Sequence, residues 1–193
     1  MKPAEQLRAH GAEFAKTVFN VGDGVYTAGG YAASNSSMIE GDDGVIIVDT
    51  TEGTRAASNI LAEFRKITDK PVRAIIYTHG HRDHISGASV FAEDGEPDIY
   101  ARANLAIELA DGGDRPYPTK LKIARTKRQF GIGLEYETEL INLGLGPGDR
   151  PLEGLGQGFL QPTNWVENAR LDVEICGIPL SLIAAPGEAE GHL

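Results

Sequence analysis

Candidate metal ligands are concentrated in one short stretch, THGHRDHISGA at Thr78–Ala88, which holds three of the chain's five histidines. Neutral imidazole and carboxylate are common ligands of zinc and similar divalent ions. His79 and His81 lie two positions apart, so in an extended backbone their side chains project to the same side and can bind one ion. Asp83 and His84 are adjacent and can face a second ion in the turn that follows. The stretch therefore predicts a two-metal site.

A two-metal site indicates hydrolytic chemistry. Ions roughly 3.5–4 Å apart can hold a hydroxide between them at neutral pH and stabilise charge on an ester oxygen as it is attacked. Asp83 is the predicted catalytic residue, because its carboxylate can bind a metal and also accept a hydrogen bond from the nucleophile. A helix N-cap is the competing interpretation of Asp83. A lone histidine would be interpreted as an exposed loop residue, but four candidate ligands in six positions favour metal binding.

The elements that position this cluster can be predicted from the hydrophobic pattern. Residues 44–49 (GVIIVD) and 72–78 (VRAIIYT) are apolar and rich in β-branched side chains, so we expect two strands, the second leading directly into the cluster. Asp49, where the first strand ends, can hydrogen-bond a ligand histidine or serve as a turn residue. Thr51 or Thr54 can cap a helix between the strands. Its apolar stripe is Ile60, Leu61, Phe64 and Ile67.

The rest of the chain shows weaker patterns. We expect a helix over residues 3–18 and short strands over 25–50, with turns at Gly29-Gly30 and at residues 41–44. The expected later elements are a strand at 98–100, a helix at 104–111, a loop-rich insert at 112–162, and a hairpin formed by 165–174 and 178–185.

Composition restricts the class of protein. The 193 residues, 41% of them hydrophobic, are predicted to form one domain, residues 1–193. A formal net charge of -10 disfavours nucleic acid and anionic membrane surfaces as partners. Cys176 has no second cysteine to pair with and is interpreted as a small core residue of an apolar strand. Without a signal peptide or a membrane-spanning stretch, the expected location is cytoplasmic.

Three stretches resemble one known family. THGHRDH matches the H-x-H-x-D-H signature of the metallo-β-lactamase superfamily. IEGDDGVIIVDT resembles its early strand pair, which ends in an aspartate, here Asp49, and APGEAEGHL resembles its later loop, which carries another metal ligand. The resemblance implies an α+β fold, a four-layer αββα sandwich in which helices cover the outer faces of two sheets.

Within the superfamily, most of the chain resembles the alkylsulfatase group, notably in RAIIYTHGHRDHISGA and RTKRQFGIGL. These enzymes are zinc hydrolases that cleave alkyl sulfate esters. The resemblance implies that His79 and His81 hold a first zinc, which Glu188 completes. It also implies that Asp83 and His84 hold a second zinc. A glutamate at the position of Glu188 is typical of alkylsulfatases, whereas the lactamase and glyoxalase branches usually have a histidine there.

The chain departs from the alkylsulfatase pattern near its end. Residues 187–190 read Gly-Glu-Ala-Glu where the group typically has Gly-Thr-Glu, so Glu190 is an alternative ligand to Glu188. His192 matches a histidine that supports the site from outside in the superfamily. The family's remaining ligands, an acidic residue and a histidine, would lie beyond Leu193. We therefore expect an N-terminal fragment whose sandwich is incomplete at the C-terminus.

This expected truncation affects metal binding and assembly. With Asp83 and His84 as its only ligands, the second zinc should bind weakly, since zinc usually takes four ligands. The alkylsulfatases continue into a dimerisation domain and a lipid-carrier-like domain, so a homodimer is expected only of a longer form.

The predicted function is zinc-dependent hydrolysis of a small anionic ester, an alkyl sulfate, by a metal-bound hydroxide. A basic group is suited to attracting the ester, although charge runs usually coat a solvated helix. Two aromatic residues are suited to an alkyl pocket, although core packing is the simpler interpretation. One alternative keeps the fold and changes the substrate to another ester, a thioester, a lactam or a lactone. A second is an inactive metal-binding fragment. The basic residues are Arg125, Lys127 and Arg128, and the aromatic residues are Phe159 and Trp165.

Overall fold

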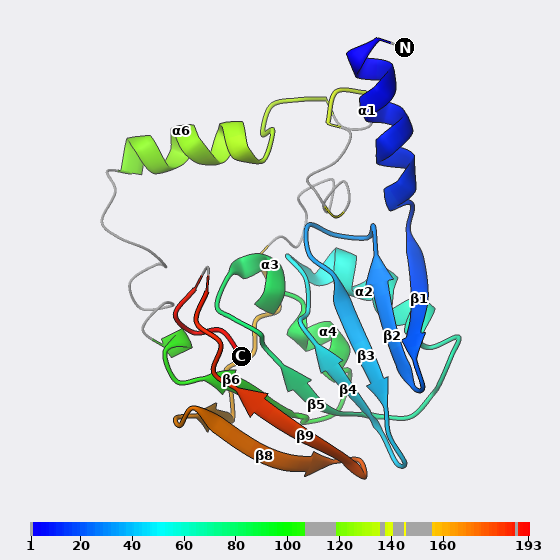
Figure 1. Ribbon diagram of the computed structural model, residues 1–193, viewed down its shortest axis with the longest axis vertical. Helices are drawn as coiled ribbons and strands as arrows, with labels where there is room; N and C mark the ends of the chain where they lie inside the picture. The colour runs from blue at the N-terminus through cyan, green and yellow to red at the C-terminus, as the bar shows by residue number, and fades with distance from the viewer. Residues whose placement is uncertain (1, 107–118, 136–137, 141–144, 146–155, 188) are drawn as a thin grey trace.

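One mixed sheet of seven strands, in the order β1-β2-β3-β4-β5-β6-β7, forms the centre of the molecule (Figure 1). The computed structural model describes all residues except 1, 107–118, 136–137, 141–144, 146–155 and 188. The strands are β1 (Thr17–Gly22), β2 (Val25–Gly29), β3 (Ser36–Glu40), β4 (Val45–Val48), β5 (Val72–Ile76), β6 (Asp98–Arg102) and β7 (Asn164–Val166). A separate hairpin consists of β8 (Arg170–Ile175) and β9 (Ile178–Ile183).

The direction of the strands changes at β4. The pairs β1–β2, β2–β3 and β3–β4 are antiparallel, whereas β4–β5, β5–β6 and β6–β7 are parallel. The parallel pairing of β4 and β5 is made possible by the crossover helix α2 (Thr54–Phe64). Because β4 and β5 are parallel neighbours, the residues that follow them meet at one edge of the sheet. There the Asp49 N–H donates to the Ile76 carbonyl over 2.9 Å.

The sheet is covered on both faces. Val45 and Ile47 of β4 belong to the core shared with α2 and α4 (Ala88–Ala92), whereas Ile46 faces the core shared with β8 and β9. This alternation is what a strand buried on both sides requires. The helical layer, the large sheet and the facing hairpin confirm the predicted α+β sandwich, of which they are three layers.

The N-terminal prediction was partly wrong. The helix α1 ends at Gly11 (Pro3–Gly11) and is followed by a single 3-10 turn, Ala12–Phe14. Val18, predicted to be helical, lies in β1, where it pairs with Ala28 of β2. Val18 is in a strand because it pairs with β2, and a helical periodicity in the sequence does not reveal that pairing.

The segment 112–162, expected to be a loop-rich insert, contains a helix that the sequence analysis did not predict. It contains the helix α6 (Thr119–Gln129), whose TKLKIARTKRQ sequence has good helix formers and no Gly or Pro. Neither α6 nor another helix in the described residues is both long and apolar enough to cross a membrane. Most of the helix predicted at 104–111 lies outside the described residues.

Three local predictions were also wrong. Gly53, rather than Thr51 or Thr54, is the N-cap of α2. Trp165 belongs to β7 in the large sheet, so the hairpin begins only at β8. Cys176 is not in a strand: it lies in the β8–β9 turn at φ 53°. The predicted strands at β4, β5 and β6 and the hairpin itself are confirmed.

Gly87 lets the turn after the histidine cluster pack against β4 and α2. A Cβ atom there would lie 2.1 Å from the Thr50 carbonyl oxygen and 2.5 Å from the Ala57 Cβ. We expect Gly87→Ala to lower the free energy of unfolding by at least about 2 kcal/mol, because backbone must move. Gly22→Ala is the matched control, since no atom lies within 4 Å of its Cβ position. Equal urea midpoints for both variants would contradict this expectation.

Candidate metal centre

The structure gathers the predicted histidines at the carboxyl end of β5. His81 is the N-cap of the short helix α3 (Arg82–Ile85), which carries His84. The ring centroid of His79 lies 4.6 Å from that of His81, 4.1 Å from that of His84 and 4.2 Å from that of His192. His79 is buried, with 4% of its surface exposed. The four rings therefore form one cluster that is not splayed into solvent.

Asp83 is next to this cluster. One of its carboxylate oxygens lies 3.5 Å from Nε2 of His84, and its side chain is 38% exposed. Asp83 is not the N-cap of α3, so that competing interpretation is wrong. Its backbone carbonyl accepts a hydrogen bond from the Ser34 hydroxyl, which holds the turn in place. The side chain of Asp83 is thus available to bind a metal ion at the site.

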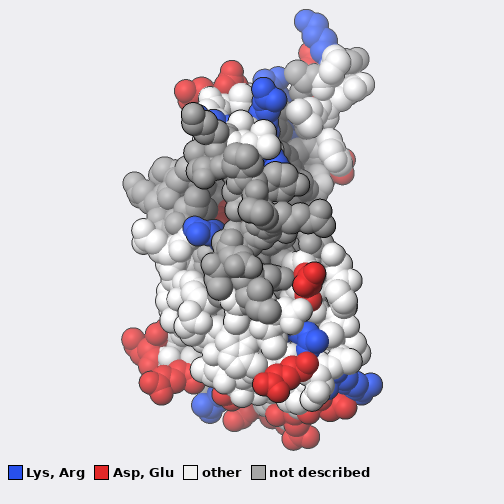
Figure 2. Space-filling view, turned by 90° about the vertical axis from the view of Figure 1, so that its left-hand side faces the viewer, with Lys and Arg blue, Asp and Glu red and all other residues white. Residues whose placement is uncertain are grey.

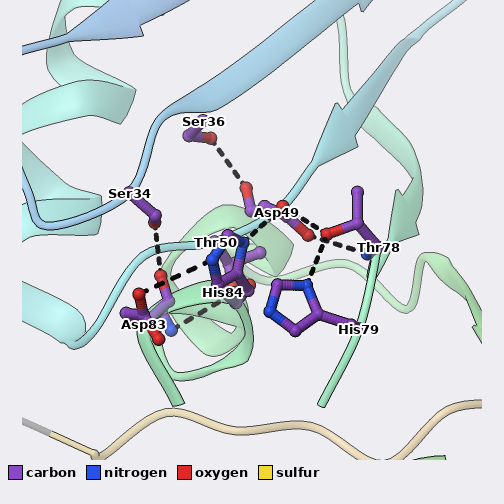
Figure 3. A network of polar contacts seen from close by, with 9 residues as sticks. Ser34, Ser36, Asp49, Thr50, Thr78, His79, Asp83 and His84 are labelled. Atoms are coloured by element: carbon purple, nitrogen blue, oxygen red, sulfur yellow. Dashed lines mark hydrogen bonds and ion pairs between the residues drawn. The ribbon is translucent and has the colours of Figure 1, made fainter. Parts of the chain in front are cut away.

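Asp49 is the centre of the polar network behind the cluster (Figure 3). One carboxylate oxygen accepts the backbone N–H of Thr78 at 2.8 Å. The other accepts the Thr78 hydroxyl at 2.7 Å and lies 2.7 Å from Nδ1 of His84. Asp49 is 6% exposed and has φ 59°, and its carbonyl accepts the Ser36 hydroxyl at 2.8 Å. The second-sphere role that was one of two sequence interpretations matches this geometry.

These hydrogen bonds determine which nitrogen of each ring carries the proton. The single hydroxyl proton of Thr78 goes to the Asp49 carboxylate, so the Thr78 oxygen must accept from Nδ1 of His79 at 3.1 Å. His79 is therefore protonated at Nδ1 and has its lone pair on Nε2. His84 donates its own Nδ1–H to Asp49 and likewise has its lone pair on Nε2. One carboxylate thus orients two rings with their ligating atoms toward the cluster.

Nε2 of His79 has the properties of a metal-ligating atom. It is buried and has no hydrogen-bond partner within the described residues. Burial, followed by the proximity of His84, His81 and His192, lowers the pKa of His79 to about 3. The ring is therefore neutral at physiological pH. A buried lone pair without a partner costs free energy unless something binds it, and a divalent ion fits.

The complete ligand set is not seen. Among the residues that the structure describes, no three His, Cys, Asp or Glu side chains are arranged so that they could hold a metal ion. Glu188, the predicted fifth ligand, lies outside the described residues. Its alternative, Glu190, is exposed. The fit to a metal thus rests on His79 and on the orientation of the rings.

The C-terminal segment closes over the cluster through its backbone. The Leu193 N–H donates to the Thr78 carbonyl at 2.8 Å, and the Ala185 N–H donates to the His192 carbonyl at 3.1 Å. Nδ1 of His192 accepts the Ala189 N–H at 3.3 Å. These contacts bring the predicted supporting histidine to the site, directly against His79.

Comparison with known proteins identifies the family. The model of the metallo-beta-lactamase superfamily matches residues 29–163, well over half of the chain. The chain belongs to the metallo-beta-lactamase superfamily. The fold and the H-x-H-x-D-H resemblance found in the sequence are therefore confirmed, and membership implies a metal-dependent site.

Several relatives are alkylsulfatases. A linear primary-alkylsulfatase from Pseudomonas sp. (strain ATCC 19151) is 39% identical over 162 residues, which cover 81% of this chain and 30% of the relative. The solved structure of the inverting sec-alkylsulfatase Pisa1 from Pseudomonas sp. has a TM-score of 0.75 at 20% identity, covering 92% of this chain and 28% of that one. The FEZ-1 metallo-beta-lactamase from Legionella gormanii has a TM-score of 0.59 at 15% identity, covering 91% and 55%. The match thus spans less than a third of the length of either of these two alkylsulfatases.

Sequence reasoning missed the threonines that support the site. The N–H of Thr50 donates to the His84 carbonyl at 2.6 Å, and the Ser86 N–H donates to the Thr51 carbonyl at 2.9 Å. Thr51 has φ 68°, an unusual conformation for a β-branched residue and one that clusters at functional sites. Thr78 carries the link from Asp49 to His79. The available signal was its position directly between a buried strand and a candidate ligand.

The structure also places the aromatic and basic residues that the sequence suggested for substrate binding. The ring of Phe159 stacks on that of Tyr77 at 6.0 Å, and the Tyr77 hydroxyl donates to the Leu160 carbonyl at 2.9 Å. Phe159 therefore packs against the core, as its simpler interpretation had it. Trp165 is 37% exposed on β7. The basic group, Arg125, Lys127 and Arg128, is exposed on α6.

Proposed function

We propose that this chain is the metal-binding part of a zinc-dependent hydrolase that cleaves alkyl sulfate esters. The observation that carries the proposal is Nε2 of His79, a buried lone pair with no hydrogen-bond partner among the described residues, in a cluster of four imidazole rings. The similarity to a linear primary-alkylsulfatase, at 39% identity, supports the choice of substrate. The substrate is a small anionic molecule.

The residues have distinct proposed roles. His79 and His81 hold one zinc together with Glu188, and Asp83 and His84 hold the other. Bound zinc ions supply a nucleophile by lowering the pKa of water and stabilise the charge that develops on the ester. Asp83 orients the nucleophile through its carboxylate. Its closeness to Nε2 of His84, 3.5 Å, supports a shared metal.

We further propose how this part relates to the whole enzyme. Residues 1–193 form a single domain in which 112–162 is an insert. Because Asp83 and His84 supply only two ligands, the second zinc binds more weakly than the first. A homodimer, if the protein forms one, belongs to a longer form.

A substrate panel tests the proposal. Purified zinc-loaded protein is incubated with dodecyl sulfate, nitrocefin and a glutathione thioester. We expect release of inorganic sulfate from dodecyl sulfate and no turnover of the other two. Turnover of only the lactam or the thioester would contradict the alkylsulfatase assignment while leaving the hydrolase assignment in place. Bound zinc without turnover of any compound would contradict catalysis by this chain.

A further inference from the structure

One positively charged residue stands within the histidine motif in the sequence. Arg82 stands between His81 and Asp83 as the first residue of α3. Its side chain is exposed, whereas both neighbours are half-buried. No hydrogen bond or ion pair joins its guanidinium group to another residue in the part of the chain that the structure describes. Among the described residues, the guanidinium group is therefore unpaired next to the proposed metal ligands.

This lack of a partner distinguishes Arg82 from the arginines that pair with a carboxylate. The chain has 28 acidic residues and 18 Lys and Arg residues, so carboxylates are plentiful. Three arginines elsewhere in the described residues pair with a carboxylate, whereas Arg125 and Arg128 on the solvated helix α6 do not. The paired arginines include Arg65 with Glu93, Arg73 with Asp43 and Arg170 with Asp172.

Many acidic side chains of the described residues lie far from this end. Figure 2 shows many acidic side chains at the lower end of the molecule, where Figure 1 places the β3–β4 and β8–β9 turns. Asp42 and Asp43 are exposed in the β3–β4 turn. From Val45 to Asp49 the chain rises by roughly 13 Å, at about 3.3 Å per residue. That exceeds the Debye length of about 8 Å at physiological ionic strength, so this charge hardly repels an anion at the site.

Gly156 lies beside the guanidinium group. A Cβ atom at Gly156 would be 3.6 Å from Nη1 of Arg82. The Gly156 N–H donates to the Glu52 carbonyl at 2.8 Å, which ties this backbone to the turn after β4. Arg82 is therefore bordered on one side by a fixed backbone segment that lacks a side chain. A ligand at the guanidinium group would meet no side chain from position 156.

We propose that Arg82 binds the anionic head group of the substrate. The planar guanidinium group presents its N–H donors as a fork that matches two oxygens of a tetrahedral oxyanion such as a sulfate ester. This makes Arg82 a specificity-determining residue that favours sulfate monoesters over neutral lactams, lactones and thioesters. The inference rests on the proposed function for the reaction that follows, but the binding of the anion is independent of turnover.

Calorimetric binding of hexyl sulfate to the zinc-loaded chain tests this inference. We expect Arg82→Gln to weaken binding by about 10- to 100-fold, because a charge-assisted bidentate contact is lost. The affinity of Arg82→Lys should lie between those of the wild type and Arg82→Gln, since lysine keeps the positive charge but lacks the forked pair of N–H donors. Arg73→Gln, at an exposed arginine near the acidic end, should bind like the wild type. Hexanol, which lacks the sulfate group, should bind equally to all four proteins.

The outcomes separate this inference from the proposed function. Unchanged hexyl sulfate affinity in Arg82→Gln, at equal zinc content and thermal midpoint, would overturn the role of Arg82, as would absence of binding to the wild type. Binding that depends on Arg82 without any hydrolysis would overturn the proposed function and leave this inference standing. Hydrolysis with the same KM in wild type and Arg82→Gln would support the proposed function and overturn the role of Arg82.

Discussion

Replacing His79 with alanine will remove the tightly bound zinc and the hydrolysis that depends on it. Nε2 of His79 is the buried, unpartnered atom of the cluster, and no other described residue offers an equivalent lone pair. The loss of zinc affinity should exceed the about 10- to 100-fold that substitution of an outer-shell residue typically causes. Elemental analysis after dialysis measures the zinc, and sulfate release from an alkyl sulfate measures the activity.

His10→Ala is the matched control for this prediction. His10 is 62% exposed on α1, where it lies 3.4 Å from Glu13, so its removal should change neither zinc content nor activity. Because His79 is buried, circular dichroism and the urea midpoint of His79→Ala must also be measured. A folded His79→Ala protein that keeps stoichiometric zinc would refute the role of His79.

Replacing Asp49 with asparagine will weaken zinc binding without breaking the fold. The carboxylate accepts hydrogen bonds from Nδ1 of His84 and from the Thr78 hydroxyl. An amide nitrogen in place of one oxygen cannot accept the proton of His84, so that ring would move its proton to Nε2 and lose its ligating lone pair. Asparagine tolerates the φ of 59° found at this position. We expect about 10- to 100-fold lower zinc affinity.

A second variant separates the two arms of this network. Thr78→Val removes the hydroxyl that links Asp49 to His79 and leaves the contact between Asp49 and His84 in place. His79 is a proposed ligand of the tightly bound zinc, and His84 is a proposed ligand of the more weakly bound zinc. Thr78→Val should therefore weaken only the first, whereas Asp49→Asn should weaken both. Asp172→Asn, on the exposed face of β8, is the control and should have no effect. Zinc affinity that is the same in all three variants would show that the hydrogen bonds of Asp49 do not orient the ligands.

The local parts of the site could be predicted from the sequence, and the long-range parts could not. The spacing of His79, His81, Asp83 and His84 is visible within six residues and predicted a ligand cluster, whose rings the structure brings together. The network behind them depends on Asp49, 29 residues before Thr78 in the chain. That contact exists only because β4 and β5 are parallel neighbours.

The errors in the fold have a similar cause. Val18 continues the apolar stripe of α1 but pairs with Ala28, and backbone pairing outweighs a weak helical pattern interrupted by Gly11. Trp165 was assigned to the hairpin because its segment reads as a strand. The structure pairs it with Ala101 of β6 instead, and the choice of partner is a property of the whole sheet.

X-ray absorption at the zinc edge, on the full chain loaded with one equivalent of zinc, tests the central claim most directly. The account predicts zinc bound by at least two imidazole nitrogens at about 2.0–2.1 Å. It also predicts that this imidazole signal is lost in the folded His79→Ala protein. Zinc held by oxygen ligands alone, or an imidazole signal that survives the loss of His79, would contradict it.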